Sequence, residues 1–206
     1  MTADSVLQQS IDALAIPGVL IAHRVISPGD ELALLPEEAD AFASSVDKVR
    51  RASGAARIVA RQLMTRLGQP QLAVRKAPSG VPIWPSGLVG SLAHTSQIAV
   101  AALARREDFS SLGIDVEPAD PLDADLLDLV ATRSERKEIS DDPHGGRLIF
   151  AIKEAVYKSV YPLDQVFLEH HDVEVNIRAR CATVRTGRTV HFRYALSDQI
   201  IVLAFI

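Results

Sequence analysis

Hydrophobic residues along the chain fall into short runs with either strand-like or helix-like spacing. The segment 18–26 is rich in branched apolar residues and precedes the turn residues 27–30, so it predicts a strand followed by a turn. From 36 to 67 the spacing is helical, with proline at the first position and acidic residues in the first turn. We expect a break in this helical tract near Ser53–Gly54, and Gly68 ends it.

The segment 69–87 contains four prolines and predicts a long ordered loop. The segments 89–94 and 97–104 then predict the two strands of a hairpin, and 111–116 predicts another strand. Further expected elements are a short helix within 120–130, a helix over 147–161 ended by Pro162, and strands within 172–206 separated by turns at 178–180, 186–188 and 197–198. This order predicts an α+β fold rather than a strict alternation of strands and helices.

One short segment is repeated along the chain. The segments 97–103 and 199–205 share Gln, Ile, Val and Ala at matching positions, 102 residues apart. Two explanations remain open, namely the common alternation of buried strands or an internal duplication. Duplication predicts two similar α+β halves in a pseudo-two-fold arrangement, 1–104 and 105–206, for which a monomer is sufficient.

Composition narrows the function classes. A net charge of −4 and a pI near 5.9 argue against a nucleic-acid partner. The single cysteine, Cys181, cannot form an intramolecular disulfide or a thiolate zinc site and fits a reducing compartment. No stretch approaches the roughly 20 apolar residues needed to cross a bilayer. We therefore expect a cytoplasmic protein without a membrane anchor.

Carboxylates and lysines gather in two segments, 113–118 and 150–158. Asp115 and Glu117 are two residues apart at the end of a predicted strand, so their side chains point the same way and repel each other unless a cation lies between them. Glu154 lies one helical turn before Lys158. With oxygen ligands and adjacent ammonium groups, these residues predict a site for Mg²⁺ and a phosphorylated substrate. A solvated strand end and a surface ion pair are the alternatives.

Basic residues supply a possible phosphate-binding surface. The segment 50–61 contains four arginines, and Arg75 and Lys76 follow in the predicted loop. Such a set could surround a polyanion through charge-assisted hydrogen bonds, or it could be a solvated basic face. His94, at the end of a short predicted strand, is placed either to contact a phosphate or to play a structural part.

Taken together, these segments resemble the 4'-phosphopantetheinyl transferases, in particular the monomeric two-halved class that primes carrier proteins of siderophore, polyketide and nonribosomal peptide synthesis. The resemblance rests on segments in the family's order: Arg57–Gly68, Pro82–Gly87, Gly90–His94, Gly113–Pro118 (Gly-Ile-Asp-Val-Glu-Pro) and Phe150–Lys158 (Phe-Ala-Ile-Lys-Glu-Ala-Val-Tyr-Lys). The last two form the family's most specific signature.

The resemblance implies transfer of phosphopantetheine from coenzyme A to a serine of an apo acyl or peptidyl carrier protein, with release of adenosine 3',5'-bisphosphate. Asp115, Glu117 and Glu154 would bind Mg²⁺, with Mn²⁺ as the other candidate metal. Asp115, Glu154 and Lys158 would form the catalytic group, with Glu154 as the base that accepts the serine proton. The residues implied to bind coenzyme A are Arg50, Arg57, Lys76, Ser91, His94, Lys153 and Lys158.

The chain departs from the family pattern at a few positions. Ala93 replaces a Ser or Thr, Ala151–Ile152 replaces Ser-Ala, and Ala56 precedes Arg57 where Gly is common. These changes leave the charged residues in place. Two other readings remain, a Mg²⁺-dependent phosphohydrolase acting on a nucleotide and a catalytically silent homologue that binds coenzyme A or a carrier protein.

Overall fold

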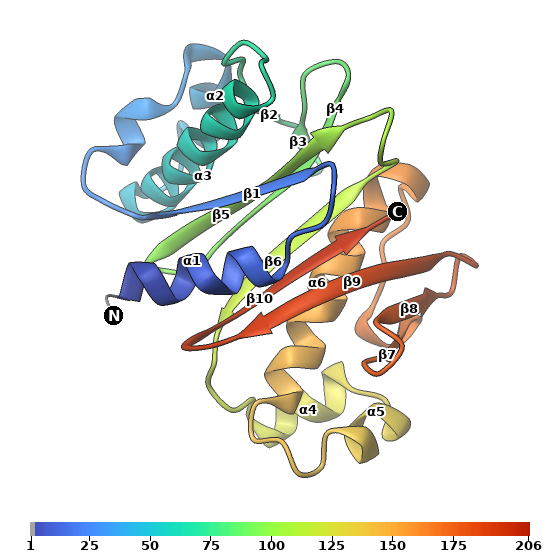
Figure 1. The fold of residues 1–206 in the computed structure, drawn as a ribbon. Coiled ribbons are helices and arrows are strands. Elements are labelled where there is room, and N and C mark those ends of the chain that lie inside the picture. Colours follow the sequence, from blue (N-terminus) through green and yellow to red (C-terminus); the bar gives the residue numbers. More distant parts are fainter. Residues whose placement is uncertain (1–2) are drawn as a thin grey trace. The chain divides into compact units, whose positions relative to one another are not determined.

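The structure is a computed structural model that describes residues 3–206 (Figure 1). It forms two compact units. The N-terminal unit comprises Ala15–Phe109, and the C-terminal unit comprises Ser110–Ile206 together with the segment that ends at Leu14. The predicted boundary at residue 105 lies near the junction, but the placement of the first residues in the N-terminal half is corrected.

Helix α1 (Ala3–Ala13) explains that correction. It packs against β9 (Thr189–Leu196) and β10 (Gln199–Phe205) of the C-terminal unit (Figure 1). Its apolar side chains Leu7 and Ile11 are buried. The hydroxyls of Ser10 and Ser197 are hydrogen-bonded at 3.0 Å. Polar residues separate the apolar positions of this segment, which left its helix unpredicted.

The N-terminal unit consists of a three-stranded antiparallel sheet in the order β1-β5-β4, packed against the long helix α3 (Figure 1). Its elements are β1 (Val19–Val25), η1 (Asp30–Ala33), α2 (Pro36–Ala39), η2 (Asp40–Phe42), α3 (Asp47–Arg66), β2 (Arg75–Lys76), β3 (Pro82–Ile83), β4 (Leu88–His94) and β5 (Ile98–Arg105). Val59, Leu63 and Met64 of α3 are buried together with Leu103 of β5. The predicted strand at 18–26 and the predicted hairpin are confirmed.

The helical tract breaks earlier than predicted. It is interrupted at 43–46 and runs unbroken through Ser53–Gly54, so the expected break there is wrong. Gly54 serves packing instead, because a Cβ at this position would lie 1.9 Å from the Asp30 carbonyl oxygen. The predicted loop 69–87 also contains two short paired strands, β2 and β3.

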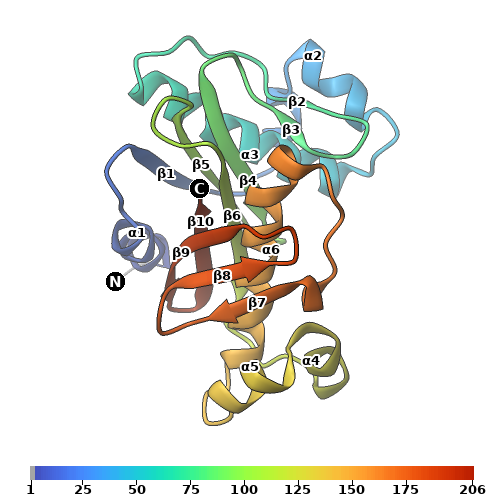
Figure 2. The ribbon, with the colours of Figure 1, turned by 90° about the vertical axis from the view of Figure 1, so that its right-hand side faces the viewer.

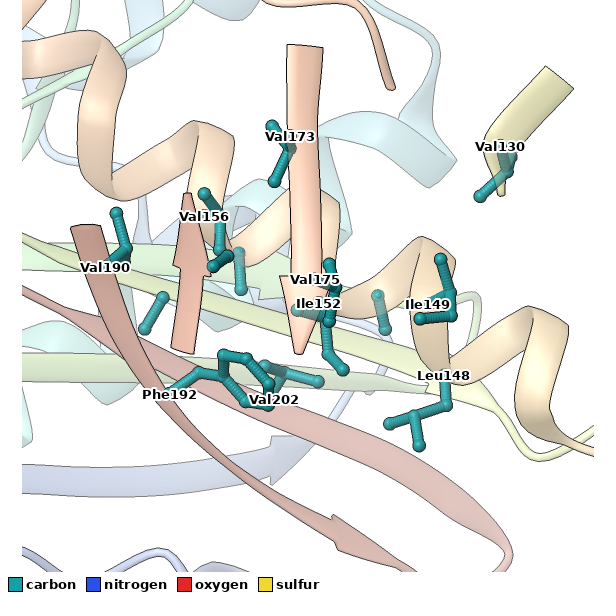
Figure 3. Close-up of a cluster of buried hydrophobic side chains, with 14 of the residues drawn as sticks. Val130, Leu148, Ile149, Ile152, Val156, Val173, Val175, Val190, Phe192 and Val202 are labelled. Atoms are coloured by element: carbon teal, nitrogen blue, oxygen red, sulfur yellow. The ribbon is translucent and has the colours of Figure 1, made fainter. Parts of the chain in front are cut away.

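The C-terminal unit contains a five-stranded antiparallel sheet in the order β6-β10-β9-β8-β7, with helix α6 packed on one face (Figure 2). The remaining elements of this unit are β6 (Leu112–Pro118), α4 (Ala124–Val130), α5 (Arg133–Glu138), α6 (Gly145–Asp164), η3 (His170–Asp172), β7 (Val173–Asn176) and β8 (Cys181–Val184). Figure 3 shows the core, where Ile152 and Val156 of α6 face Phe192 and Val202 of the sheet.

Helix α6 extends beyond the predicted end at Pro162. It continues to Asp164, and Gln165 ends it in a left-handed conformation, with φ of 52°. Proline near the end of a helix removes one backbone hydrogen bond, and packing of the preceding turns against the sheet compensates for that loss. The short helix α4 and the strands after residue 172 were predicted, whereas α5 was not.

The two units repeat one arrangement of elements. Strands β1-β5-β4 with helix α3 correspond to β6-β10-β9 with helix α6. The echoed segments 97–103 and 199–205 form β5 and β10, each hydrogen-bonded on both sides. The prediction of an α+β fold with two similar halves is therefore confirmed.

Among the described helices, none is both long and apolar enough to cross a membrane.

Candidate active site

Strand β6 and helix α6 bring the predicted acids and a lysine together in the C-terminal unit. Gly113 allows this approach, because a Cβ there would lie 1.8 Å from the Ala155 carbonyl oxygen of α6. Lys158 Nζ donates to Asp115 Oδ1 at 2.6 Å and to the Ile114 carbonyl oxygen at 3.2 Å. The two signature segments therefore meet through a charge-assisted hydrogen bond.

Asp115 retains an unused acceptor. Its carboxylate is buried, and among the described residues its Oδ2 atom has no hydrogen-bond partner. Glu117 is further along the same strand, where Arg147 Nη1 donates to its Oε2 at 3.4 Å. Burial raises the pKa of Glu117, and the charges of Asp115 and Glu154 raise it further. The carboxylates of this site are thus close enough to repel one another.

Glu154 is the carboxylate of this group whose surroundings best suit a proton acceptor. It is half-buried on α6, and it makes no hydrogen bond or ion pair with any residue in the described range. Burial raises the pKa of its carboxyl, the charge of Asp115 adds to this, and Lys158 partly offsets it. A carboxylate that is desolvated and unpaired is a stronger proton acceptor than a solvated one.

The donor set suits a hard divalent cation. All three acids supply oxygen, Asp115 Oδ2 is buried without a partner, and a cation would relieve the repulsion that raises the carboxyl pKa values. Within residues 3–206, however, no three Asp, Glu, His or Cys side chains are arranged to hold a metal ion. The residue types therefore fit a metal, whereas a closed set of ligands is not formed.

A cavity of about 620 Å³ lies beside Glu154 in the C-terminal unit. Residues of α4, α6, η3 and the segment that follows α6 line it, among them Leu129, Glu154, Tyr157 and Phe167. Leu129 and Phe167 are 66% and 69% exposed, which is unusual for large apolar side chains. The site thus combines an acid with an accessible apolar wall.

Lys153 lies outside this charged group. Its side chain is buried, and Nζ donates to Glu135 Oε2 at 2.8 Å and to the carbonyl oxygens of Val130 and His170, each at 2.9 Å. An ammonium group has three hydrogens, and these contacts use all of them. The expectation that Lys153 contacts a phosphate of coenzyme A is therefore corrected, because no donor remains for one.

Arg57 is likewise a structural residue of its unit. It is buried on α3, where Nε donates to the Val74 carbonyl oxygen at 2.9 Å and Nη1 to that of Ser53 at 3.2 Å. Its guanidinium also stacks on Phe42, 4.7 Å from the ring centre. Burial lowers its pKa, while Glu38 opposes that change. These contacts leave its expected role in binding coenzyme A unsupported.

The N-terminal unit has its own cavity, of about 550 Å³. Lys48 and Arg51 of α3 line it, together with His94, Thr95 and Ser96 at the turn between β4 and β5. Two cations and an imidazole beside one hollow suit a phosphorylated ligand. Of the residues expected to bind coenzyme A, His94 is the one that lines this cavity.

The other three expected residues lie elsewhere in that unit. Arg50 is 3.9 Å from Asp47 in an exposed ion pair, and Lys76 Nζ is 5.1 Å from the centre of the Phe42 ring. Ser91 is buried in β4. Lys48 and Arg147 were not singled out from the sequence. Their spacing offered a signal, since Lys48 is three residues before Arg51 and Arg147 lies on the predicted helix that carries Glu154.

Comparison with known proteins identifies the family of this chain. The model of the 4'-phosphopantetheinyl transferase N-terminal domain matches residues 37–104, and the model of the 4'-phosphopantetheinyl transferase superfamily matches residues 111–202. The latter match contains Asp115, Glu117, Glu154 and Lys158.

Three curated proteins are similar along the sequence. The 4'-phosphopantetheinyl transferase Npt of Nocardia iowensis is 36% identical, over 92% of this chain and 86% of that protein. The corresponding values are 34%, 92% and 85% for 4'-phosphopantetheinyl transferase PptT of Mycobacterium tuberculosis. They are 38%, 73% and 64% for 4'-phosphopantetheinyl transferase Svp of Streptomyces mobaraensis. The chain therefore belongs to the 4'-phosphopantetheinyl transferase superfamily, as a two-domain transferase with the N-terminal and superfamily domains in succession.

Proposed function

We propose that this transferase moves the 4'-phosphopantetheine group of coenzyme A to a serine hydroxyl of an apo acyl or peptidyl carrier protein, with Mg²⁺ at the acidic site. The observation that carries the proposal is the grouping of Asp115, Glu154 and Lys158, in which, among residues 3–206, one carboxylate oxygen of Asp115 is buried without a hydrogen-bond partner and the Glu154 carboxylate is unpaired. Both features suit a reaction in which phosphate charge is neutralised and a hydroxyl loses a proton.

Each residue has a defined task in this proposal. Glu154 accepts the proton of the attacking serine, since its raised pKa makes it a stronger base than a solvated carboxylate. Lys158 orients Asp115 through the 2.6 Å contact and supplies positive charge beside the phosphate oxygens. Asp115, Glu117 and Glu154 would hold Mg²⁺. When bound, the ion would neutralise charge on the pyrophosphate.

The N-terminal cavity supports a site for coenzyme A. Lys48, Arg51 and His94 converge there on a volume of about 550 Å³. Arg51 also pairs with Glu31 at 3.1 Å, which holds its side chain against η1. We place the phosphorylated nucleotide of coenzyme A in this cavity. Arg50, Lys76 and Ser91 remain candidates for more distant contacts.

The exposed apolar wall supports a docking surface for the carrier protein. Leu126 and Leu129 of α4 are exposed, as is Phe167, and the latter two line the cavity that contains Glu154. A carrier protein has to bring its serine to Glu154, so the surface next to this acid is where it docks. Apolar side chains at such a position contribute binding free energy when the partner covers them.

Intact-mass analysis of an apo carrier protein incubated with the transferase, coenzyme A and Mg²⁺ tests the proposal. We expect a gain equal to one phosphopantetheine group, which is lost with EDTA and with Glu154→Gln. Glu174→Gln is the matched control, because it changes an exposed carboxylate of the same unit. Intact coenzyme A without labelling of any carrier class would contradict transfer. Hydrolysed coenzyme A without labelling would instead indicate a phosphohydrolase.

A further inference from the structure

Lys153 belongs to a buried network that ties α6 to four neighbouring segments. Its partner Glu135 is 1% exposed, and Lys153 is 2% exposed. Glu135 Oε2 also accepts from the Thr132 N–H at 2.7 Å, and Oε1 accepts from the Val175 N–H at 2.8 Å. The pair therefore joins α6 to the start of α5 and to β7. Through the carbonyl oxygens of Val130 and His170, it also reaches the end of α4 and η3.

The N-terminal unit contains the same network with an arginine. Arg61 Nη1 donates to both oxygens of Glu38, at 3.1 and 3.0 Å, and Nη2 donates to the Ala33 carbonyl oxygen at 2.6 Å. Glu38 is fully buried and accepts from the N–H groups of Leu35 at 2.9 Å and Val74 at 2.7 Å.

In both networks, the buried glutamate has the same kinds of hydrogen-bond partner. In each, a buried glutamate accepts the N–H of the residue three positions earlier, at the start of a short helix, and the N–H of a residue beyond the long helix. In each, a cation on the long helix bonds this glutamate and a carbonyl group two residues before the short helix's N-cap. A close-packed glycine precedes each cation by seven residues, Gly54 before Arg61 and Gly146 before Lys153.

The two units differ in the reactive residues around this network. In the alignment that this correspondence sets, Gln62 occupies the position of Glu154, and Arg66 that of Lys158. Strand register places His23 opposite Val100, just as Asp115 is opposite Val202. The N-terminal unit therefore keeps the buried pair without the carboxylates, which supports a packing role for such a pair independent of the acidic group.

We propose that Lys153 is a positioning residue: with Glu135 it fixes α6 against its neighbours and thereby fixes where the adjacent Glu154 carboxylate lies. Within the described residues Glu154 makes no hydrogen bond or ion pair of its own, so the position of α6 largely sets where its carboxylate lies. The lysine next to the acid acts through that acid and does not touch coenzyme A. The catalytic consequence rests on the proposed function, whereas the packing role does not.

The test compares Lys153→Met with Arg61→Met, the equivalent change in the unit that lacks the acids. Hydrogen exchange is read at the Thr132 and Val175 amides for the first variant and at the Leu35 and Val74 amides for the second. We expect each pair of amides to exchange at least about tenfold faster, since the glutamate loses its buried counter-charge. Carrier labelling is measured on the same preparations under conditions where both proteins are folded.

The kinetic constants of the variants distinguish three explanations for an effect of Lys153. It could position Glu154, it could contact a phosphate of coenzyme A, or its replacement could disturb the fold in general. Lys153→Met should lower kcat by roughly 10- to 100-fold, because a displaced base is costly, with KM for coenzyme A within about twofold. Arg61→Met should leave kcat within about twofold. Lys153→Arg, which copies the cation of the other unit, should restore slow exchange and most of kcat.

Three results would overturn the inference. They are unchanged exchange at Thr132 and Val175, a raised KM for coenzyme A at unchanged kcat, and an equal loss of kcat in both methionine variants. If Lys153→Met yields no folded protein, Lys153→Gln keeps a hydrogen-bond donor and replaces it in every measurement. If the wild-type protein labels no carrier, the proposed function has failed, and the exchange data still decide the packing role.

Discussion

Single side chains in the C-terminal unit differ in reactivity because their surroundings differ. Asp115 is buried and held by Lys158, whereas Glu154 is half-buried and unpaired among the described residues. Burial raises the pKa of Glu154, and the charge of the nearby Asp115 carboxylate raises it further. Glu154 is therefore the acid of this pair whose surroundings favour proton acceptance.

The surroundings of His170 make the stability of the protein depend on pH. Burial lowers its pKa below 6.5, and the charges of Lys153 and His171 lower it further. The folded protein thus binds fewer protons at this site than the unfolded chain. The resulting stability is complete above pH 6.5 and is lost as pH falls through the lowered pKa. In metal-free buffer, we expect the free energy of unfolding to decrease in this window by at most about 1.4 kcal/mol per pH unit from this group.

Urea unfolding of the wild type and of His170→Gln between pH 5 and pH 7.5 checks this expectation. The variant should show a smaller pH slope than the wild type, and the two should differ most at the acidic end. His191→Gln, which removes an exposed histidine that is not among the causes of the His170 pKa shift, controls for the loss of an imidazole as such. Identical slopes in the wild type and His170→Gln would show that this group does not set the acid sensitivity.

Residue types and spacing were sufficient to place the acids on one strand and one helix face, whereas the hydrogen-bond partners of the long cationic side chains depended on distant residues. Asp115 and Glu117 share a strand, and Glu154 and Lys158 share a helix face, so local geometry brought each pair together. Lys153 bonds Glu135, 18 positions away, and Arg57 bonds Val74, 17 positions away. The tertiary fold determines whether such a cationic side chain bonds other residues of the protein or remains available for a ligand. Sequence spacing alone does not reveal which of the two occurs.

At the scale of elements, glycine controls how closely a strand and a helix approach. A Cβ on Gly113 would lie 1.8 Å from the Ala155 carbonyl oxygen and 2.9 Å from the Ser159 nitrogen. Both atoms belong to the backbone of α6, which cannot rotate away as a side chain can. The glycine thus determines the separation of the two elements that carry Asp115 and Lys158.

Gly113→Ala should therefore push β6 and α6 apart. We expect unfolding to become easier by about 3 kcal/mol, at the upper end of overpacking effects, and carrier labelling to fall by more than the loss of folded protein. Chemical denaturation and labelling of the same samples give the two values.

Gly187→Ala is the matched control for this change. Gly187 has a φ of 88°, and a Cβ there would meet no atom of the described residues within 4 Å apart from its chain neighbours, so alanine strains the backbone by about 1–2 kcal/mol without displacing an element. Its labelling should match that of the wild type. Equal stability and activity of Gly113→Ala and the wild type would contradict the tight approach of β6 to α6.

A similar close approach at Gly54 explains an error of sequence-based prediction. Gly54 suggested a helix break, since glycine weakens helices, yet α3 is continuous there and packs against the Asp30 carbonyl oxygen. Helix propensity describes how a residue changes the stability of the helix that contains it. It does not include the neighbour that needs the missing side chain, and that neighbour lies 24 positions earlier in the sequence.

For the whole molecule, repetition of one α+β unit was predictable because the repeated strand is central in both sheets. Buried on both faces, β5 and β10 keep apolar residues at most positions, which preserved a detectable echo. Helix α1 lies outside the repeat, and the short helix α5 corresponds to α2; neither α1 nor α5 was predicted. Reactive side chains occur in one copy, so the duplicated fold supports different tasks in its two units.

This division predicts separable kinetic effects of changes in the two cavities. Arg51→Ala removes a cation from the N-terminal cavity, so KM for coenzyme A should rise by about tenfold, as expected for a lost charge-assisted hydrogen bond. Leu129→Ser removes exposed apolar surface beside Glu154, so KM for the carrier protein should rise by about fivefold. In both variants kcat should change little, since neither residue is assigned to the reacting group.

Steady-state labelling with each substrate varied in turn measures both constants, and Arg178→Ala, which changes a 92% exposed side chain, provides the control. The expected result is that each variant affects a different substrate. Should Arg51→Ala raise KM for the carrier instead, the N-terminal cavity would belong to the docking surface. Should Leu129→Ser raise only the KM for coenzyme A, the apolar wall would bind the pantetheine arm of coenzyme A rather than the carrier protein. Either exchange would reverse the assignment of the two cavities while leaving the acidic group on β6 and α6 as the proposed site of transfer.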